Sequence, residues 1–445
     1  MQGSLKRRVL AGGSWVLFGR VITALSTMAI NAMLSRLLTQ SAFGVYLMAF
    51  SLVAVASLVA QLGLSSTVVR LVAESLGLGN PGRARAAVEI AYRYAALGVV
   101  AVAAFLLLGG GSWLALGLWD SELLAASLGS VAAWVAVLSF QTLTSETFRS
   151  FQDLRLASVF GGVITSLLMI ASLGVVSLTE GEASFAQVIV IYMLCGAVSL
   201  TVAASFVYRK VVRLGPRQAL ATREVFAISG PLWINALMVF GLQRSDIWIL
   251  GATRSAEEVA IYGAAAVLVS LISQTMILVN LIVPPIIAEL YALGEKQRLQ
   301  RVLRNTATVA GLPALAVIIP FVFFGSPVLG LIYPDEYRAG AAVLAVLSVA
   351  KLFDVWTGSA SFVLSMTGFH AVLMRITIVS SLATIGVAVA VVGRYGGIGV
   401  ALAIGGGVCV QALWVWISAR YYTGIWTHFG IPSVEDVRSL FSRGT

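Results

Sequence analysis

The sequence contains little charge, since only 11% of its 445 residues are Asp, Glu, Lys or Arg, whereas 59% are hydrophobic. A soluble domain carries about 25% charged residues, so this composition excludes an ordinary soluble globule. Histidine and cysteine are also scarce, with two of each, which leaves neither a disulfide framework nor a plausible His-based metal site. A phosphate-binding loop of the P-loop type is missing, so we expect no ATPase activity of the chain's own.

Most of the sequence consists of long apolar runs. Windows of about 20 residues, the helix length that crosses roughly 30 Å of hydrocarbon, locate twelve such runs. They are long and lack the alternation of barrel strands, so they predict helices. The fold class is therefore an all-α polytopic membrane protein with about twelve transmembrane helices. The segments are 11–36, 43–69, 86–110, 122–146, 156–179, 185–208, 225–250, 258–287, 302–325, 339–366, 371–392 and 397–421.

The basic residues are distributed unequally between the two sides of these segments. With the amino terminus inside, the inner segments hold 22 Lys and Arg and the outer loops hold four. Because Lys and Arg are retained in short cytoplasmic loops, we predict a multi-pass protein of the inner, cytoplasmic membrane with both termini in the cytoplasm. The net charge of +10 then reflects topology and contact with anionic lipids rather than binding of nucleic acid.

The chain resembles itself at an offset of about 216 residues. SAFGVYLMAFSLVAVASLVAQ (41–61) is similar to EEVAIYGAAAVLVSLISQTMI (257–277), and a basic loop follows each of them. Six helices per half is an even number, so both halves enter the membrane in the same orientation, as a parallel repeat. We predict an N-terminal six-helix bundle (1–208), a cytoplasmic linker (209–224), a C-terminal six-helix bundle (225–421) and a cytoplasmic tail (422–445), with a central cavity between the bundles.

The first segment carries a charge near the middle of the membrane. Arg20 lies about 15 Å into this helix at 1.5 Å per residue, and Thr27 and Asn31 fall on nearly the same face. A charge at this depth is costly and usually faces protein or water. A substrate role and a structural arginine tied to headgroups or to a neighbouring helix both stay open. Glu146, close to the inner end of the fourth segment, is expected at the interface.

The seventh and tenth segments carry further charges. Arg244 and Asp246 project from opposite sides of their helix, and Asp246 shares its face with Asn235. An interfacial pair held by headgroups is the alternative to a functional role. Lys351 and Asp354 are three residues apart and can pair on one face. A buried salt bridge that pins two helices accounts for that pair as well as a substrate role does.

Two stretches resemble a known family. The opening GSWVLFGRVITALSTMAINAMLSRLLTQSAFGVYLMAFSLVAVASLVAQLGLSSTVVR is similar to the first two helices of MOP superfamily polysaccharide flippases, the Wzx-type O-antigen and exopolysaccharide transporters. The marks are an early polar helix, a Leu-rich outer end and FGVY in the first turn of the second helix. ISGPLWINALMVFGLQRSDIWILGATRSAEEVAIYG resembles the seventh helix of that family through its early Pro, its late Asp and the Tyr that begins the next helix.

The resemblance implies a transporter rather than an enzyme. It would work by alternating access and turn lipid-linked oligosaccharide, carried on undecaprenyl pyrophosphate, from the inner to the outer leaflet. Arg20 and Arg244, one in each predicted half, would hold the pyrophosphate or acidic sugars. Asp246 and Asp354 would couple transport to H⁺ or Na⁺. The residues expected to bind substrate are Arg20, Thr27, Asn31, Asn235, Arg244 and Lys351.

The expected partners follow from the same resemblance. They are the lipid-linked oligosaccharide, membrane lipids and the coupling ion, and polysaccharide-assembly enzymes are candidate partners. No cofactor, metal or nucleic acid is expected.

Three alternatives stay open. A multidrug exporter of the same superfamily shares the helical plan, but cationic drugs favour an acidic cavity, whereas Arg20, Arg244 and Lys351 are basic. A lipid II flippase is closer in chemistry, yet it carries two further helices. A membrane-embedded glycosyl polymerase or ligase would be expected to show a large outer loop with clustered catalytic residues.

Overall fold

The computed structural model describes residues 2–430, in side chains as well as backbone except at residues 2–18, 239, 242, 243, 275–282 and 285. Within this range every regular element is a helix and there is no strand, which confirms the predicted all-α class. Two compact units are distinguished by their internal contacts, unit 1 (Met1–Ala260) and unit 2 (Ile261–Thr445). Residues 431–445 of the predicted tail lie outside the described residues.

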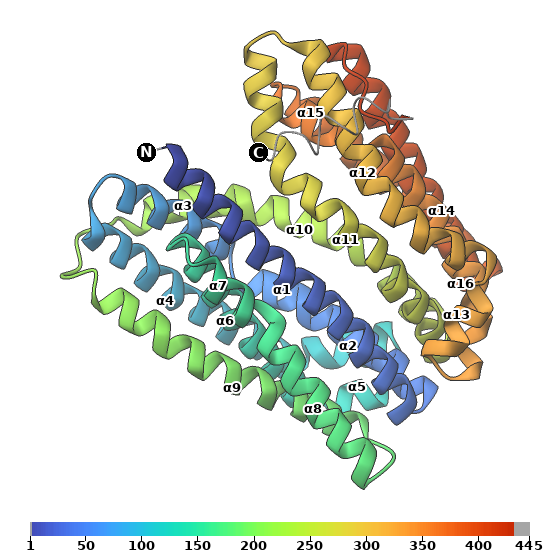
Figure 1. Cartoon of the computed structure of the whole chain (residues 1–445). Helices are drawn as coiled ribbons and strands as arrows, with labels where there is room; N and C mark the ends of the chain where they lie inside the picture. The colour runs from blue at the N-terminus through green and yellow to red at the C-terminus, as the bar shows by residue number, and fades with distance from the viewer. Residues whose placement is uncertain (1, 431–445) are drawn as a thin grey trace. The chain divides into compact units, whose positions relative to one another are not determined.

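Unit 1 is built around α6 and α2. The helix α6 packs against α3, α4 and α9 as well as α2, and α2 packs in addition against α4 and α10. The helix α10 also contacts α3 and belongs to unit 1. The sequence instead predicts a linker at 209–224 that separates α10 from the N-terminal bundle. The pair of six-helix halves stays a prediction. The elements, blue to light green in Figure 1, are α1 (Gln2–Leu37), α2 (Gln40–Ala60), α3 (Leu64–Gly77), α4 (Pro81–Phe105), η1 (Leu106–Gly110), η2 (Trp113–Leu118), α5 (Glu122–Ala126), α6 (Leu128–Ser150), α7 (Leu154–Ser158), η3 (Val159–Val163), α8 (Ile164–Thr179), α9 (Phe185–Val212) and α10 (Thr222–Thr253).

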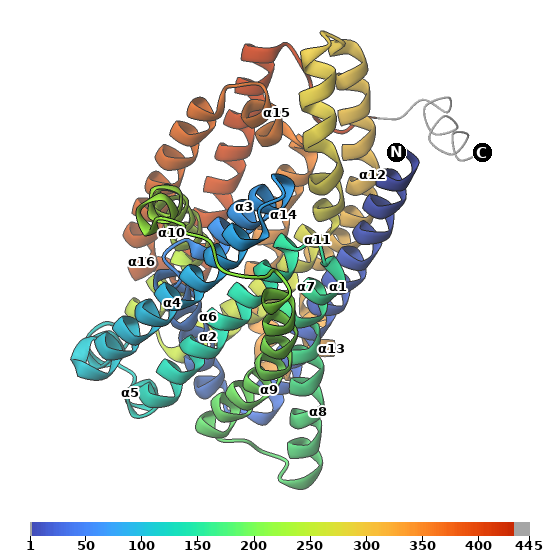
Figure 2. The same ribbon diagram turned by 90° about the vertical axis from the view of Figure 1, so that its left-hand side faces the viewer.

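Unit 2 is centred on α14, which packs against α12 on one side and α16 on the other (Figures 1 and 2). Its buried core includes Ile287, Leu303 and Val363, each inaccessible to solvent. The helix α11 (Ala256–Ala292) begins in unit 1 and continues into unit 2. The elements that follow are α12 (Lys296–Phe323), α13 (Gly325–Ile332), η4 (Asp335–Gly340), α14 (Ala341–Thr357), α15 (Ala360–Met366) and α16 (His370–Thr423).

Each of the twelve predicted segments lies mainly in helix. Nine helices of the described part are long and apolar enough to cross a membrane, and α16 alone covers two predicted segments, which meet at Gly396 (φ 57°). Segment 122–146 is divided at Ser127, between α5 and α6, and left-handed backbone divides two further segments: 43–69 at Leu62 and Gly63 (φ 51° and 73°), and 339–366 at Gly358 (φ 66°). Left-handed backbone of this kind ends a helix. The two segments therefore continue as the separate shorter helices α3 and α15.

After α16, residues 424–430 form a strap across unit 2. The Thr427 hydroxyl donates to the Thr357 carbonyl oxygen at 2.6 Å, and the Phe429 amide donates to the Trp356 carbonyl oxygen at 3.1 Å. These bonds tie the strap to the end of α14. They also hold the imidazole of His428 among three indoles, with ring centroids 5.5 Å from Trp356, 5.4 Å from Trp416 and 5.3 Å from Trp426.

The strap should make stability depend on pH. Burial, followed by the positive charge of Arg304, lowers the pKa of His428 below its ordinary value of 6.5. The folded state therefore favours the neutral imidazole, and protonation favours the unfolded state. The stability that the neutral His428 contributes is fully present above about pH 6.5, the pKa of histidine in the unfolded chain. It is lost progressively as the pH falls from there through the lower pKa of His428 in the folded chain. Thermal unfolding of the purified chain between about pH 8 and 5 should show a falling midpoint.

His428→Phe keeps an aromatic ring among the indoles but cannot be protonated, so its unfolding midpoint should fall less steeply with pH than that of the wild type. His370→Phe is the matched control, because His370 begins α16 outside the strap. An unchanged slope in His428→Phe would refute the assignment.

Candidate functional site

The polar stripe predicted on the first helix exists on α1. Thr23 donates to the Gly19 carbonyl, Thr27 to the Thr23 carbonyl and Asn31 to the Thr27 carbonyl, each at 2.8 Å. These local bonds satisfy the side-chain donors and leave acceptor oxygens along the stripe. Asn31 is 6% exposed, and its Oδ1 accepts no hydrogen bond from the described residues. The stripe thus presents acceptors next to the guanidinium donors of Arg20, whose side chain is exposed.

Arg20 is positioned by a close helix contact, and its charge acts on a carboxylate of another helix. At Gly19, α1 approaches α7 so closely that a Cβ would lie 2.8 Å from the Cβ of Ser158. The guanidinium of Arg20 makes no ion pair within the described residues, but its charge acts on the carboxylate of Glu146 in α6. Glu146 is also paired with Arg149 at 2.9 Å. The sequence predicts Glu146 only at the interface; the action of the Arg20 charge on it depends on tertiary packing, which no local pattern reveals.

Arg244 is held between two aromatic rings. The centre of its guanidinium lies 5.8 Å from the ring centroid of Phe50 on α2 and 5.8 Å from that of Phe240, one turn earlier on α10. A cation at this distance is attracted to the face of the ring. One turn further, the Trp248 indole donates to the Ser51 hydroxyl at 2.9 Å. These contacts fix the Arg244 side of α10 against α2, so the half-buried guanidinium is held in a defined position.

The other two candidates on α10 have different surroundings. Asp246 is half-buried, and its Oδ1 accepts from the Ile247 amide at 2.8 Å. Asn235 is exposed. Arg20 and Arg244 both lie in unit 1; the charge of Arg20 acts on a carboxylate of α6, whereas Arg244 lies against a ring of α2. The sequence predicts one of these arginines in each half of the chain, whereas both lie in the same compact unit.

Lys351 and Asp354 form the predicted pair on α14. Their Nζ and Oδ2 atoms are 3.1 Å apart, and the side chains are 31% and 52% exposed. The pair joins neighbouring turns of one helix and is not buried, so it differs from a salt bridge that pins two helices. Among the described residues, no three His, Cys, Asp or Glu side chains lie close enough together to hold a metal ion.

Comparison with known families gives one match. Residues 9–291 match the sequence model of a family described as polysaccharide biosynthesis protein. A search of curated proteins finds no match.

Several solved structures share the fold. The chain is similar to an inward-facing multidrug resistance MATE family transporter of the MOP superfamily, with a TM-score of 0.74 and 16% identity over 92% of this chain and 98% of that one. It is similar to a MATE transporter from Vibrio cholerae, with a TM-score of 0.64 and 16% identity over 94% and 97%. A MOP superfamily transporter from Pyrococcus furiosus, described as having a binding pocket of reverse polarity, gives 0.60 and 16% over 94% and 96%. At these identities the likeness shows the fold alone.

Proposed function

The chain belongs to the family of polysaccharide biosynthesis proteins, and on this premise we propose that it is a flippase for lipid-linked oligosaccharide. The cargo is an oligosaccharide on undecaprenyl pyrophosphate, and it moves from the inner to the outer leaflet by alternating access. The protein then lies in the inner membrane with both termini in the cytoplasm, as the basic loops predict. Nothing in this proposal requires a cofactor.

The observation that carries the proposal is a pair of arginines on α1 and α10, two helices that the sequence predicts to span the membrane, within a chain of this family. A guanidinium is always charged and binds phosphate oxygens through paired N–H groups. Arg20 lies beside the polar stripe of α1, and Arg244 is held in place by two rings. In this proposal both bind the pyrophosphate, while Thr27, Asn31, Asn235 and Lys351 contribute to binding of the cargo.

Energy for transport comes from an ion gradient in this proposal. Asp246 and Asp354 are the carboxylates assigned to H⁺ or Na⁺, because each lies on a helix that also bears a substrate-binding cation, Arg244 or Lys351. Protonation of Asp354 would release Lys351, its partner at 3.1 Å, to bind an anion. Polysaccharide-assembly enzymes remain candidate partners.

The alternatives account less well for these residues. Drug export is supported by the MATE fold, but the arginines on α1 and α10 suit an anionic cargo better than a cationic drug. The Pyrococcus furiosus transporter, for which reverse pocket polarity suggests a different function, is a precedent for one fold with more than one pocket chemistry. The substrate of a lipid II flippase also carries a pyrophosphate, so only the cargo assay distinguishes that function from the proposed one. A polymerase or ligase is disfavoured by a fold shared with transporters.

The test is delivery of a fluorescent undecaprenyl-pyrophosphate glycan to the outer leaflet of proteoliposomes, read by quenching from outside. Liposomes that contain the wild-type chain should expose the glycan faster than empty liposomes. A fluorescent lipid II analogue and a fluorescent cationic drug, assayed in the same way, separate the alternatives. Movement of the drug without movement of any glycolipid would overturn the proposal.

A further inference from the structure

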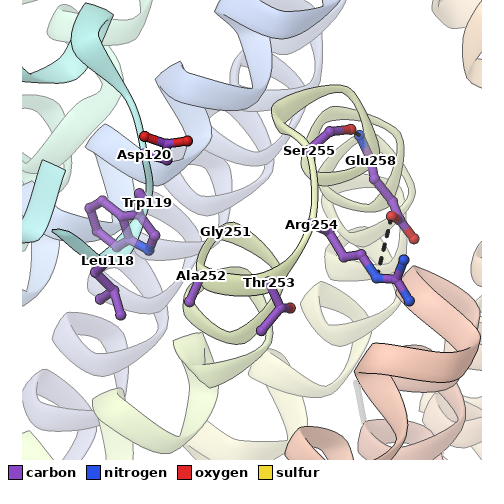
Figure 3. A pocket seen from close by; sticks show the side chains of 9 residues that line it. All are labelled: Leu118, Trp119, Asp120, Gly251, Ala252, Thr253, Arg254, Ser255 and Glu258. Carbon is purple, nitrogen blue, oxygen red and sulfur yellow. Dashed lines mark hydrogen bonds and ion pairs between the residues drawn. The ribbon is translucent and has the colours of Figure 1, made fainter. Parts of the chain in front are cut away.

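A cavity of about 440 Å³ opens in unit 1 where the loop between η2 and α5 meets the turn between α10 and α11. Both connections are outer loops in the predicted topology. The volume falls within the range of about 300–1,000 Å³ that is typical of small-ligand pockets. The residues around it (Figure 3) are Leu118, Trp119, Asp120, Gly251, Ala252, Thr253, Arg254, Ser255 and Glu258.

The cavity contains a buried hydrogen-bond donor. Trp119 is 5% exposed, and its indole Nε1 has no hydrogen-bond partner among the described residues. In Figure 3 this nitrogen lies on the side of the indole that faces Gly251 and Ala252. A Cβ at Gly251 would lie 3.1 Å from Nε1 and 2.5 Å from the sulfur of Met48, so the absence of a side chain at Gly251 allows the indole to pack close to its backbone. Because a buried N–H without a partner is costly, a ligand that accepts from it gains binding energy.

Charged groups lie around the same cavity. Asp120 is exposed, and its backbone has a φ of 46°, a left-handed conformation that residues other than glycine rarely adopt. Opposite it in Figure 3, Arg254 Nε and Glu258 Oε2 are 3.9 Å apart, with side chains 28% and 34% exposed. Thr253 and Ser255 add hydroxyl groups. Strained residues of this kind cluster at functional sites.

This set of groups suits a sugar ring. Two carboxylates accept hydrogen bonds from neighbouring sugar hydroxyls, while the guanidinium and the indole donate to ring and hydroxyl oxygens. Two carboxylates against one guanidinium disfavour an anion, and three charged groups disfavour an apolar ligand. We propose that this cavity, on the predicted outer side of unit 1, binds one pyranose residue of the cargo; the identity of that ligand rests on the proposed function.

The experiment observes the indole N–H directly. The full-length chain is labelled with ¹⁵N-tryptophan in lipid nanodiscs, and Trp119→Phe identifies the Trp119 signal among those of the ten tryptophans. The probes are methyl glucoside, methyl galactoside and N-acetylglucosamine, titrated separately. At least one should shift the Trp119 signal saturably, and Asp120→Asn should weaken that binding by about tenfold. Asp335→Asn, a change at an exposed carboxylate paired with Arg338 in unit 2, should leave it unchanged.

Two results would overturn the inference: no probe shifts the Trp119 signal up to its solubility limit, or the wild type and Asp120→Asn respond equally. The glycolipid assay is independent of this readout. Transport by wild type with no response of Trp119 would remove the sugar site and leave the flippase proposal standing. A Trp119 response that is lost in Asp120→Asn, without transport of any glycolipid, would support the sugar site and refute the flippase.

Discussion

Arg20→Ala and Arg244→Ala should each lower the rate of glycolipid delivery about tenfold to a hundredfold. Hydrogen bonds to a charged group contribute about 1.5–3 kcal/mol, and a tenfold change corresponds to about 1.4 kcal/mol. Each substitution removes a guanidinium from a helix that is predicted to span the membrane, and with it the paired donors for pyrophosphate. The measurement is the initial rate of outer-leaflet delivery in proteoliposomes that contain equal amounts of inserted protein.

Controls separate binding from folding. Arg338→Ala removes an exposed arginine that is paired with Asp335 at 2.8 Å, so delivery should stay at the wild-type rate. Arg244→Ala also loses the contacts with Phe50 and Phe240, so Arg244→Lys, which keeps a cation near the rings, should retain stability but lose paired recognition of phosphate. If both alanine variants deliver the glycolipid at the wild-type rate, the proposed transport function stands, but the assignment of Arg20 and Arg244 to the substrate site is wrong.

The helices could be predicted from sequence because lipid leaves the backbone few choices. A spanning segment must satisfy its own N–H and C=O groups, so length and hydropathy locate it. The breaks were harder to predict. Leu62 lies within an apolar run and still adopts φ 51°, and Gly358 resembles many glycines that stay helical. Whether such a residue ends a helix depends on the helices packed around it, which hydropathy does not describe.

The candidate site could be predicted only in part. Depth and helical periodicity identified Arg20 and its stripe from one segment, and those are local properties. The rings around Arg244 include Phe50 on another helix, and Glu146, the carboxylate on which the charge of Arg20 acts, lies on α6 rather than on α1. The cavity around Trp119 combines two loops that are far apart in sequence. Contacts of this kind arise from tertiary packing, so no motif in either loop predicts them.

Gly98→Ala should destabilise unit 1 by about 1–3 kcal/mol or more, as overpacking of a close-packed interior does. Gly98 of α4 is buried where the helix crosses α2, and a Cβ there would collide with the carbonyl oxygen of Ala60 and lie 3.0 Å from its carbonyl carbon. The obstacle is helix backbone, which cannot rotate aside as a side chain can. The two helices must therefore separate, and their close contact is lost.

Gly174→Ala is the matched control, because Gly174 is also helical, in α8, and a Cβ there meets nothing within 4 Å. Alanine is favoured over glycine in a helix by about 1 kcal/mol, so this variant should be as stable as the wild type or more stable. Thermal or denaturant unfolding in the same detergent compares the two substitutions. Equal midpoints would mean that α2 and α4 tolerate the extra methyl group and that their contact at Gly98 is looser than the structure places it.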